Sequence, residues 1–110
     1  MRIDEFVLAR VAEDEVVARS AIADGEGARD WAGTEGATDA HIARHDPARV
    51  LAECAAKRAI LADHTPADDG RCGLCSDLYC VTPWDGICDV ARPLAAVYAD
   101  HPDYDPAWAW

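Results

Sequence analysis

The sequence predicts a mainly α-helical fold, a small domain of three helices with a long irregular loop between the second and the third helix. Two segments repeat their apolar residues at the spacing of an amphipathic helix, and a third carries a shorter run of the same kind. The length of 110 residues suffices for one hydrophobic core and not for two. We therefore expect residues 1–110 to form a single small domain.

The first helix is expected at residues 3–23. Its apolar stripe, at helical spacing, consists of Ile3, Phe6, Val7, Val11, Val17 and Ala21. Asp4 and Glu5 stand in the first turn, where negative charge complements the positive end of the helix dipole. Arg10 and Asp14 interrupt the stripe, so we expect this helix to pack near its ends and to be more hydrated in the middle.

A flexible loop is expected at residues 24–45, because glycines are frequent in its first part and apolar periodicity is low. His41 and His45 stand four positions apart near its end, a spacing that on a helix would place both on one face and let them bind a metal. The next helix signal comes only at Asp46 and Pro47. We therefore expect both histidines to lie outside a helix, in surface or capping roles.

The second helix is expected at residues 47–63. Asp46 can cap it, and Pro47 suits the first helical position. Its apolar face consists of Val50, Leu51, Cys54, Ala55, Leu61 and Ala62. This face and the stripe of the first helix both need a partner, so we expect the two helices to pack against each other, with Cys54 as a core residue.

The third helix is expected at residues 89–99, after an irregular loop at 64–88 and before an extended aromatic tail at 100–110. Prolines and glycines interrupt the loop, and so long a structureless loop is uncommon in a compact domain unless it is functional or held together. Pro93 is tolerated because it falls near the first turn of the third helix. We expect the aromatic residues of the tail, which include Trp108 and Trp110, to pack back on the body of the domain, with disorder as the alternative.

The irregular loop carries suitable ligands for a zinc ion. Cys72 and Cys75 form a C-x-x-C motif that can deliver two thiolates from one turn, and a structural zinc takes four nitrogen or sulfur ligands. Two ligand sets compete, one with His64, Cys72, Cys75 and Cys88, the other with Cys80 in place of His64. We favour the first set, because His64 ends the second helix and Cys88 precedes the third. One ion would then connect both helix ends to the loop. This set also places three thiolate charges around the ion, whereas four cysteines would place four.

The context of the motif favours a metal over disulfides. The N-terminal residues carry carboxylates, and no apolar run of a signal peptide or a membrane span follows. We therefore expect a cytoplasmic protein with reduced thiols, and five cysteines are an odd count for a disulfide framework. Reduced cysteines without a metal, or a redox C-x-x-C, are the alternatives. Neither H-x-E before P-C-x-x-C nor H-E-x-x-H is present, so we expect a closed structural site.

Three blocks of the sequence resemble a known family. They are HIARHDPARVL at 41–51, the segment from Lys57-Arg58 through Ile60-Leu61 to His64, and YADHPDY at 98–104 with the following Trp108. The C-x-x-C at 72–75 and a cysteine before the last helix accompany them. Together they are similar to a family of short uncharacterised proteins from actinobacteria and their phages, a domain of unknown function. The resemblance implies a source and no activity, and it implies the ligand set that contains the histidine. The chain departs from the family pattern at Cys80 and Pro93, and the first departure leaves the fourth ligand open.

The net charge of −11 disfavours binding to phosphate backbones. We expect a zinc-stabilised module that binds an unknown protein partner through its acidic surface and aromatic tail, as an accessory protein of a phage or an actinobacterium, without catalytic activity. We expect no nucleic-acid or membrane partner, and the oligomeric state is open. An inhibitor that mimics DNA is the alternative. A zinc-dependent enzyme, or one that uses Arg44, His45 and Asp46 as acid–base groups, is less favoured.

Overall fold

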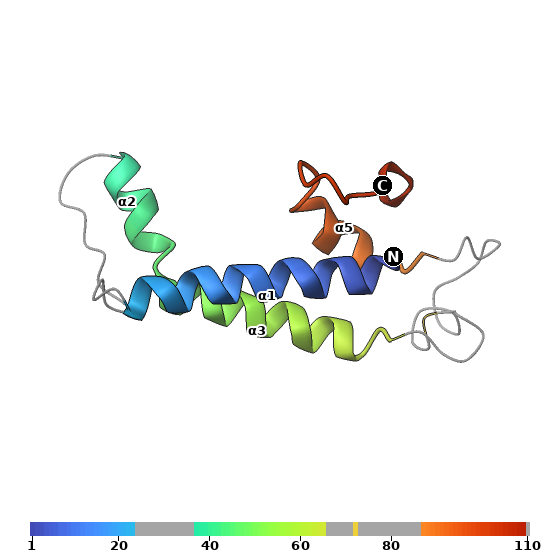
Figure 1. Cartoon of the computed structure of the whole chain (residues 1–110), viewed down its shortest axis with the longest axis horizontal. Coiled ribbons are helices and arrows are strands. Elements are labelled where there is room, and N and C mark those ends of the chain that lie inside the picture. The colour runs from blue at the N-terminus through green and yellow to red at the C-terminus, as the bar shows by residue number, and fades with distance from the viewer. Residues whose placement is uncertain (24–36, 66–71, 73–86, 110) are drawn as a thin grey trace. The chain divides into compact units, whose positions relative to one another are not determined.

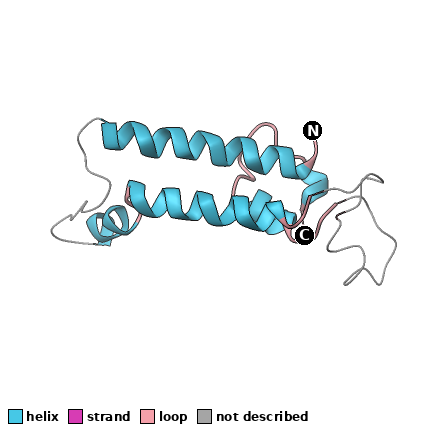
Figure 2. Cartoon of the chain, turned by 90° about the horizontal axis from the view of Figure 1, so that it is seen from below, coloured by secondary structure: helices cyan, strands magenta, loops and turns pink. Residues whose placement is uncertain are grey.

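The computed structural model describes residues 1–23, 37–65, 72 and 87–109. These residues contain four α-helices, a 3₁₀-helix and no β-strand, which confirms the mainly helical fold class (Figures 1 and 2). The elements are α1 (Ile3–Ala21), α2 (Ala37–Arg44), α3 (Pro47–Ala62), α5 (Ala91–Ala96) and the 3₁₀-helix η2 (Pro106–Trp108). In this part of the chain no helix is both long and apolar enough to cross a bilayer.

The chain divides into two compact units. The first unit consists of Met1–Arg10 and Lys57–Trp110, and the second consists of Val11–Ala56. Each of the two long helices, α1 and α3, contributes residues to both units. Each unit has buried side chains of its own, and the expectation of a single domain around one core stays a prediction.

The sequence signals at the start of the two long helices are confirmed. Asp4 and Glu5 occupy the first turn of α1. At the start of α3 the Asp46 Oδ1 accepts a hydrogen bond from the Arg49 N–H at 2.9 Å, as an N-cap residue does. Pro47 follows as the first helical residue. The α-helical part of α1 ends at Ala21, and residues 22–23 continue it as π-helix to the predicted end, whereas α3 ends one residue before the predicted end at 63.

The prediction of a loop at residues 24–45 is wrong for the second half of this range, where α2 occupies Ala37–Arg44. Three of these eight residues are alanine, the strongest helix former, and no glycine or proline interrupts them. The glycines that indicated a loop all precede Ala37, and residues 24–36 lie outside the described part of the chain. The described residues thus hold four helices where three were expected, and His41 lies inside α2.

The third predicted helix, at 89–99, is shorter in the structure, where α5 occupies only Ala91–Ala96. Val90 stands at its N-cap position and provides no side-chain hydrogen bond to the first turn. Pro93 has no N–H to donate within the helix. After Ala96 the backbone continues in tight turns, in which the Tyr98 N–H donates to the Ala95 carbonyl at 2.9 Å. The weak start and the proline explain why the helix covers so little of the predicted range.

The tail expected to be extended at 100–110 is folded. It passes through turns and then forms η2. The Oδ1 of Asp105 accepts a hydrogen bond from the Ala107 N–H at 2.9 Å, and this bond caps η2. Pro106, the residue after the cap, suits the first position of such a turn. Trp108 is buried, with 5% of its surface exposed, so the tail packs back as expected.

The core of the first unit forms around Phe6, whose side chain is fully buried. Four rings from the C-terminal segment lie against it, and we call these five residues the Phe6 cluster. The distances from the Phe6 ring centre are 5.0 Å to Trp108, 5.8 Å to His101, 6.0 Å to Tyr104 and 6.4 Å to Tyr98. The rings meet edge-on or tilted, which is the arrangement that aromatic side chains favour.

Arg10 is buried, so the prediction of a hydrated middle of α1 is wrong at this position. Its Cζ lies 5.4 Å from the ring centre of Phe6, and its Nη1 lies 2.8 Å from the Nδ1 of His101. The same Nη1 lies 3.8 Å from a carboxylate oxygen of Asp103. A buried guanidinium is tolerated where polar groups accept its hydrogen bonds. Helical periodicity could not indicate this arrangement, because His101 stands 91 residues along the chain.

In the second unit, the part of α1 after Val11 lies beside the first turns of α3 (Figure 2). Val11 and Cys54 are both buried. The Cys54 thiol donates to the Val11 carbonyl at 3.8 Å, which confirms Cys54 as a core residue. Val17, which belongs to the predicted apolar stripe, is 69% exposed. The apolar stripe of α1 is therefore only partly covered within this unit.

Candidate metal centre

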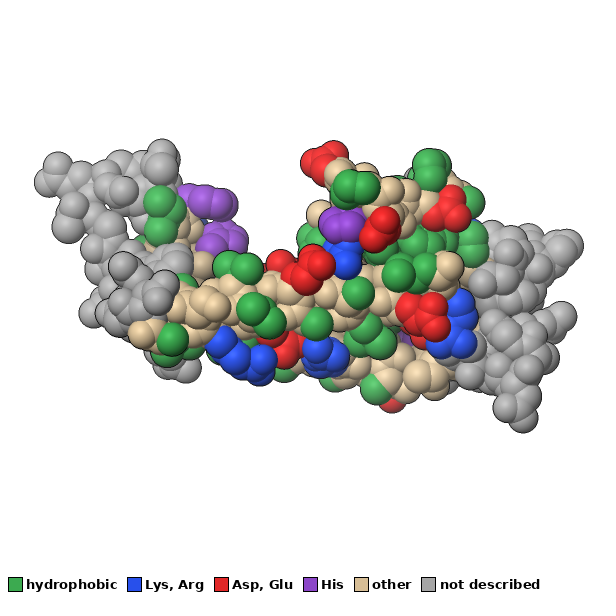
Figure 3. Space-filling view, viewed as in Figure 1, with side chains coloured by type: hydrophobic (Ala, Val, Ile, Leu, Met, Phe, Trp, Pro, Cys, Tyr) green, Lys and Arg blue, Asp and Glu red, His purple; other side chains and the backbone are tan. Residues whose placement is uncertain are grey.

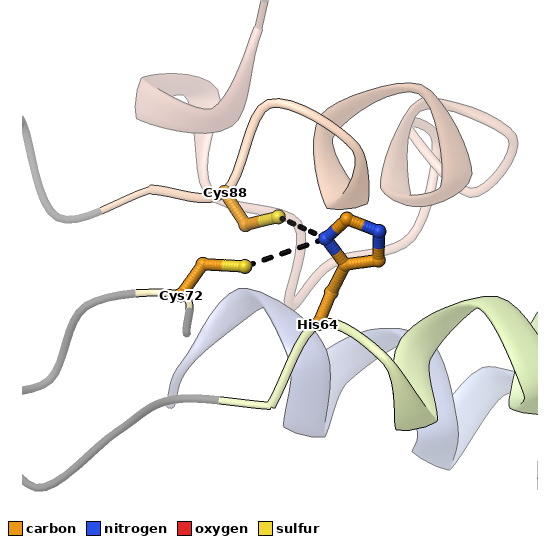
Figure 4. A group of neighbouring side chains, drawn as sticks. All are labelled: His64, Cys72 and Cys88. Atoms are coloured by element: carbon orange, nitrogen blue, oxygen red, sulfur yellow. Dashed lines mark hydrogen bonds between the residues drawn. The ribbon is translucent and has the colours of Figure 1, made fainter. Parts of the chain in front are cut away.

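Three of the predicted metal ligands meet in the first unit (Figure 4). The ligand atoms of His64, Cys72 and Cys88 all lie within 4.8 Å of one another. The Nδ1 of His64 is 3.3 Å from the Sγ of Cys72 and 3.6 Å from the Sγ of Cys88. Both cysteines are buried, and His64 is half-buried. These three residues could hold a metal ion.

Helix ends position two of these ligands. His64 follows α3, and its N–H donates to the carbonyl of Leu61 at 3.0 Å, which tightens the turn at the end of that helix. Cys88 precedes α5, and its carbonyl accepts the N–H groups of Ala91 at 3.0 Å and Arg92 at 3.2 Å. Cys72 lies between them in the sequence, outside the described helices. The expectation that the histidine ends one helix and the last cysteine precedes another is therefore confirmed.

The separations between the ligand atoms suit a tetrahedral ion. With zinc–nitrogen and zinc–sulfur bonds of about 2.0–2.3 Å, tetrahedral ligand atoms lie about 3.5–3.8 Å apart. The two nitrogen–sulfur distances in the structure, 3.3 and 3.6 Å, fall close to that range. The three residues would need only small movements to hold an ion at this point. Cys54, Cys72 and Cys88 are thiols in this structure, so none of these sulfurs is held in a disulfide.

Two further predicted ligands, Cys75 and Cys80, lie outside the described residues. The structure therefore brings together one histidine and two cysteines of the favoured set, and the fourth ligand stays a prediction. Cys54, in the second unit, is not part of this group.

The alternative set of acid–base groups is used for local structure. The carboxylate of Asp46 caps α3, and the Nδ1 of His45 lies 2.8 Å from the carbonyl oxygen of His41. Arg44 and Asp46 line one surface depression, whereas His45 lines a separate cavity of about 300 Å³. That cavity has almost entirely aliphatic walls, with Asp14 as the other polar residue. The three residues therefore do not face one common cavity there.

Sequence reasoning missed the burial of Arg10 and its contact with His101. The only sequence signal was the YADHPDY block, which stood out for its resemblance and not for any chemical pattern. The aromatic residues of that block contribute to the Phe6 cluster.

A family model described as a family of unknown function (DUF6221) matches residues 1–110. No curated protein and no solved structure matches the chain. The resemblance to an uncharacterised family is therefore borne out, whereas the actinobacterial or phage source stays a prediction.

Proposed function

The chain belongs to this family of unknown function, and we propose that it is a small acidic module that is stabilised by a zinc ion and that acts by binding another protein. His64, Cys72, Cys75 and Cys88 would hold one Zn²⁺. The observation that carries the metal proposal is the convergence of His64, Cys72 and Cys88 from three separate segments, at distances that suit a tetrahedral ion.

The chemistry of the ligands supports zinc as the ion. Thiolate and imidazole groups favour zinc and other soft or borderline metals, whereas magnesium and calcium prefer oxygen ligands. A tetrahedral site with one nitrogen and three sulfurs is closed, because no position is left for a water or a substrate. The burial of Cys72 and Cys88 supports a closed site as well. We therefore propose a structural role for the ion and no catalytic activity.

The ion would add cohesion to the segments around it. The helix that follows Cys88, α5, has only six residues and contains a proline. Helices much shorter than about 12 residues are marginal in water without tertiary contacts. A zinc ion that connects His64, Cys72 and Cys88 would fix the end of α3 and the approach to α5 in one place. Binding of the metal and folding of these segments would be one event.

Metal content tests this proposal directly. Native mass spectrometry of the chain, purified from cells grown with zinc, should show one zinc ion per chain. The His64→Ala, Cys72→Ser and Cys88→Ser variants should lose it, while Cys54→Ala, which removes a thiol from the second unit, should keep it. A Cys80→Ser variant decides between the ligand sets, since it should keep the ion if His64 is a ligand. Wild-type protein without zinc, or with these sulfurs bonded in pairs, contradicts the proposal.

The proposal that the chain binds another protein is supported by its negative net charge and by exposed apolar side chains. The net charge is −11, and hydrophobic side chains lie at the surface among charged ones (Figure 3). Val16 and Val17 on α1 are 62% and 69% exposed. The tail cannot supply the predicted aromatic contact through Trp108, because this side chain is buried. We therefore propose that the apolar contact comes from α1 in the second unit.

A photo-crosslinking amino acid placed at Val17 tests the surface. In a lysate of an actinobacterium it should give a defined covalent product, and excess unlabelled wild-type chain should compete it away. The same amino acid at Glu5, on the exposed side of α1 in the first unit, is the matched control and should give none. Equal products from both positions, or no product from Val17, count against the proposed surface.

A further inference from the structure

We propose that His41 and His45 form a second metal site, which binds a divalent transition-metal ion independently of the site at His64. The two residues lie at the end of α2, where His41 belongs to the last turn and His45 follows directly. Both are exposed, and histidine side chains gather at the surface beside α2 (Figure 3). Positions four apart on a helix lie on one face. Two imidazoles are thus presented to solvent side by side.

The hydrogen bond of His45 prepares one of its nitrogens for a metal. Its Nδ1 lies 2.8 Å from the carbonyl oxygen of His41. A carbonyl oxygen only accepts hydrogen bonds, so Nδ1 carries the proton and donates it. In a neutral imidazole this leaves Nε2 with its lone pair available. Histidines that bind metals commonly donate their other N–H to a backbone carbonyl in this way, which fixes both the tautomer and the orientation of the ring.

The spacing of the rings fits one shared ion. The ring centres of His41 and His45 are 4.4 Å apart, and the ring planes are tilted by 37°. With metal–nitrogen bonds near 2.1 Å, two imidazoles at right angles around an ion have centres about 4.5 Å apart, and at a tetrahedral angle about 5 Å apart. The measured separation is closer to the right-angle arrangement. Ni²⁺ and Cu²⁺ bind imidazole and accept ligands at right angles, so they are ions that the pair could share.

The net charge of the chain and the number of nearby ligands determine how tightly this site binds an ion. The net charge of −11 raises the local concentration of cations near the chain. Among the described residues, the only group of three or more suitable ligands is the one at His64. The histidine pair thus supplies two ligands, and water completes the coordination. We expect an exchangeable ion, bound much more weakly than one at a four-ligand site, that stabilises the last turn of the eight-residue helix α2.

Nickel is the probe for the test, because it does not oxidise the thiols as copper does. The full-length chain, equilibrated with one equivalent of zinc, is titrated with Ni²⁺ and followed by calorimetry. Nuclear magnetic resonance of the imidazole protons is recorded in parallel. Paramagnetic broadening should reach the ring signals of His41 and His45 first and leave those of His64 sharp at low nickel. His41→Ala and His45→Ala should each weaken nickel binding at least about tenfold, since even loss of an outer partner has such an effect.

Ile42→Ala is the matched control, since Ile42 is an exposed neighbour on the same helix, and it should bind nickel like the wild type. His41→Ala leaves the hydrogen-bond acceptor of His45 in place, because that acceptor is a backbone carbonyl. The proposal is overturned if either histidine variant keeps the affinity of the wild type. It is also overturned if broadening begins at His64, or if nickel does not bind.

Discussion

The Phe6 cluster and the group of His64, Cys72 and Cys88 belong to the same unit, yet they bury their side chains for different reasons. Phe6 is covered by large aromatic rings, and removal of apolar area from water stabilises that contact whatever ions are present. Cys72 and Cys88 offer little apolar area, and their closeness to an imidazole nitrogen becomes favourable when a cation lies between the three atoms. The packing of the Phe6 cluster therefore needs no ion, whereas we propose that the group of His64, Cys72 and Cys88 is stable only with a bound metal ion.

The largest expected effect comes from removal of the metal. Chelation of zinc-loaded protein should unfold at least residues 64–100, because binding energy in structural zinc sites is folding energy, on the order of 10 kcal/mol in small zinc domains. Far-UV circular dichroism and thermal melting, with and without chelator, measure the loss. A calcium-selective chelator is the control. An unchanged spectrum and melting curve would remove the distinction between the two clusters.

Phe6→Ala should cost about 3–5 kcal/mol in the free energy of unfolding, as truncation of a fully buried aromatic residue does. Zinc content per chain should stay the same, because Phe6 is not a ligand. Urea denaturation and native mass spectrometry report the two quantities on one sample. Ile60→Ala, at a position on α3 that is 40% exposed, serves as the control and should change stability little. Loss of zinc in Phe6→Ala would show that the clusters are coupled.

Arg10→Met should cost about 1.5–3 kcal/mol, the range for loss of a hydrogen bond to a charged group, while the apolar stem of the side chain is kept. The main lost contact is the one between Nη1 and the ring of His101, and the contacts of the guanidinium with Asp103 and with the Phe6 ring are lost as well. Arg2→Met removes an exposed arginine before α1, whose ion pairs contribute little, and it is the matched substitution. Equal unfolding midpoints in urea for the two variants would contradict the burial of Arg10.

Asp105→Ala should have the smallest effect, about 0.5–1.5 kcal/mol, because it removes one hydrogen bond at the start of η2. The change should appear as faster amide hydrogen exchange at Ala107 and Trp108, with no change near His64. Asp100→Ala removes an exposed carboxylate of the same segment and is the control. If amide hydrogen exchange at Trp108 is the same in both variants, the hydrogen bond of Asp105 does not stabilise η2.

The sequence predicted the parts of the fold that depend on local signals. The start of α3 could be placed because Asp46 and Pro47 have their capping roles in any context. The meeting of His64, Cys72 and Cys88 could be anticipated because few other roles suit these residue types at that spacing. The glycines before Ala37 indicated a loop more strongly than the alanines from Ala37 onward indicated a helix, and α2 was therefore not predicted.

Features that depend on distant partners could not be predicted in the same way. Arg10 interrupts an apolar stripe, and the groups that make its burial favourable include His101 and Asp103, which lie far along the chain. The tail was expected to be extended, whereas in the structure it is folded and Trp108 packs against Phe6, about a hundred positions earlier in the chain. For the candidate site, ligand types and spacing were sufficient to anticipate that His64, Cys72 and Cys88 lie close together. The metal itself, and the choice between His64 and Cys80, stay predictions that the metal content of the variants tests.

Contact between Phe6 and Trp108 also constrains how the chain folds while it is being made. The ribosome must add about a hundred residues after Phe6 before Trp108 exists, which takes roughly 5–20 seconds at about 5–20 residues per second. During that time the apolar face of the nascent first helix has no aromatic cover and is open to chaperones. His64 and Cys88 are 24 positions apart, so Cys88 is made within a few seconds of His64, and these two side chains can meet before Trp108 reaches Phe6.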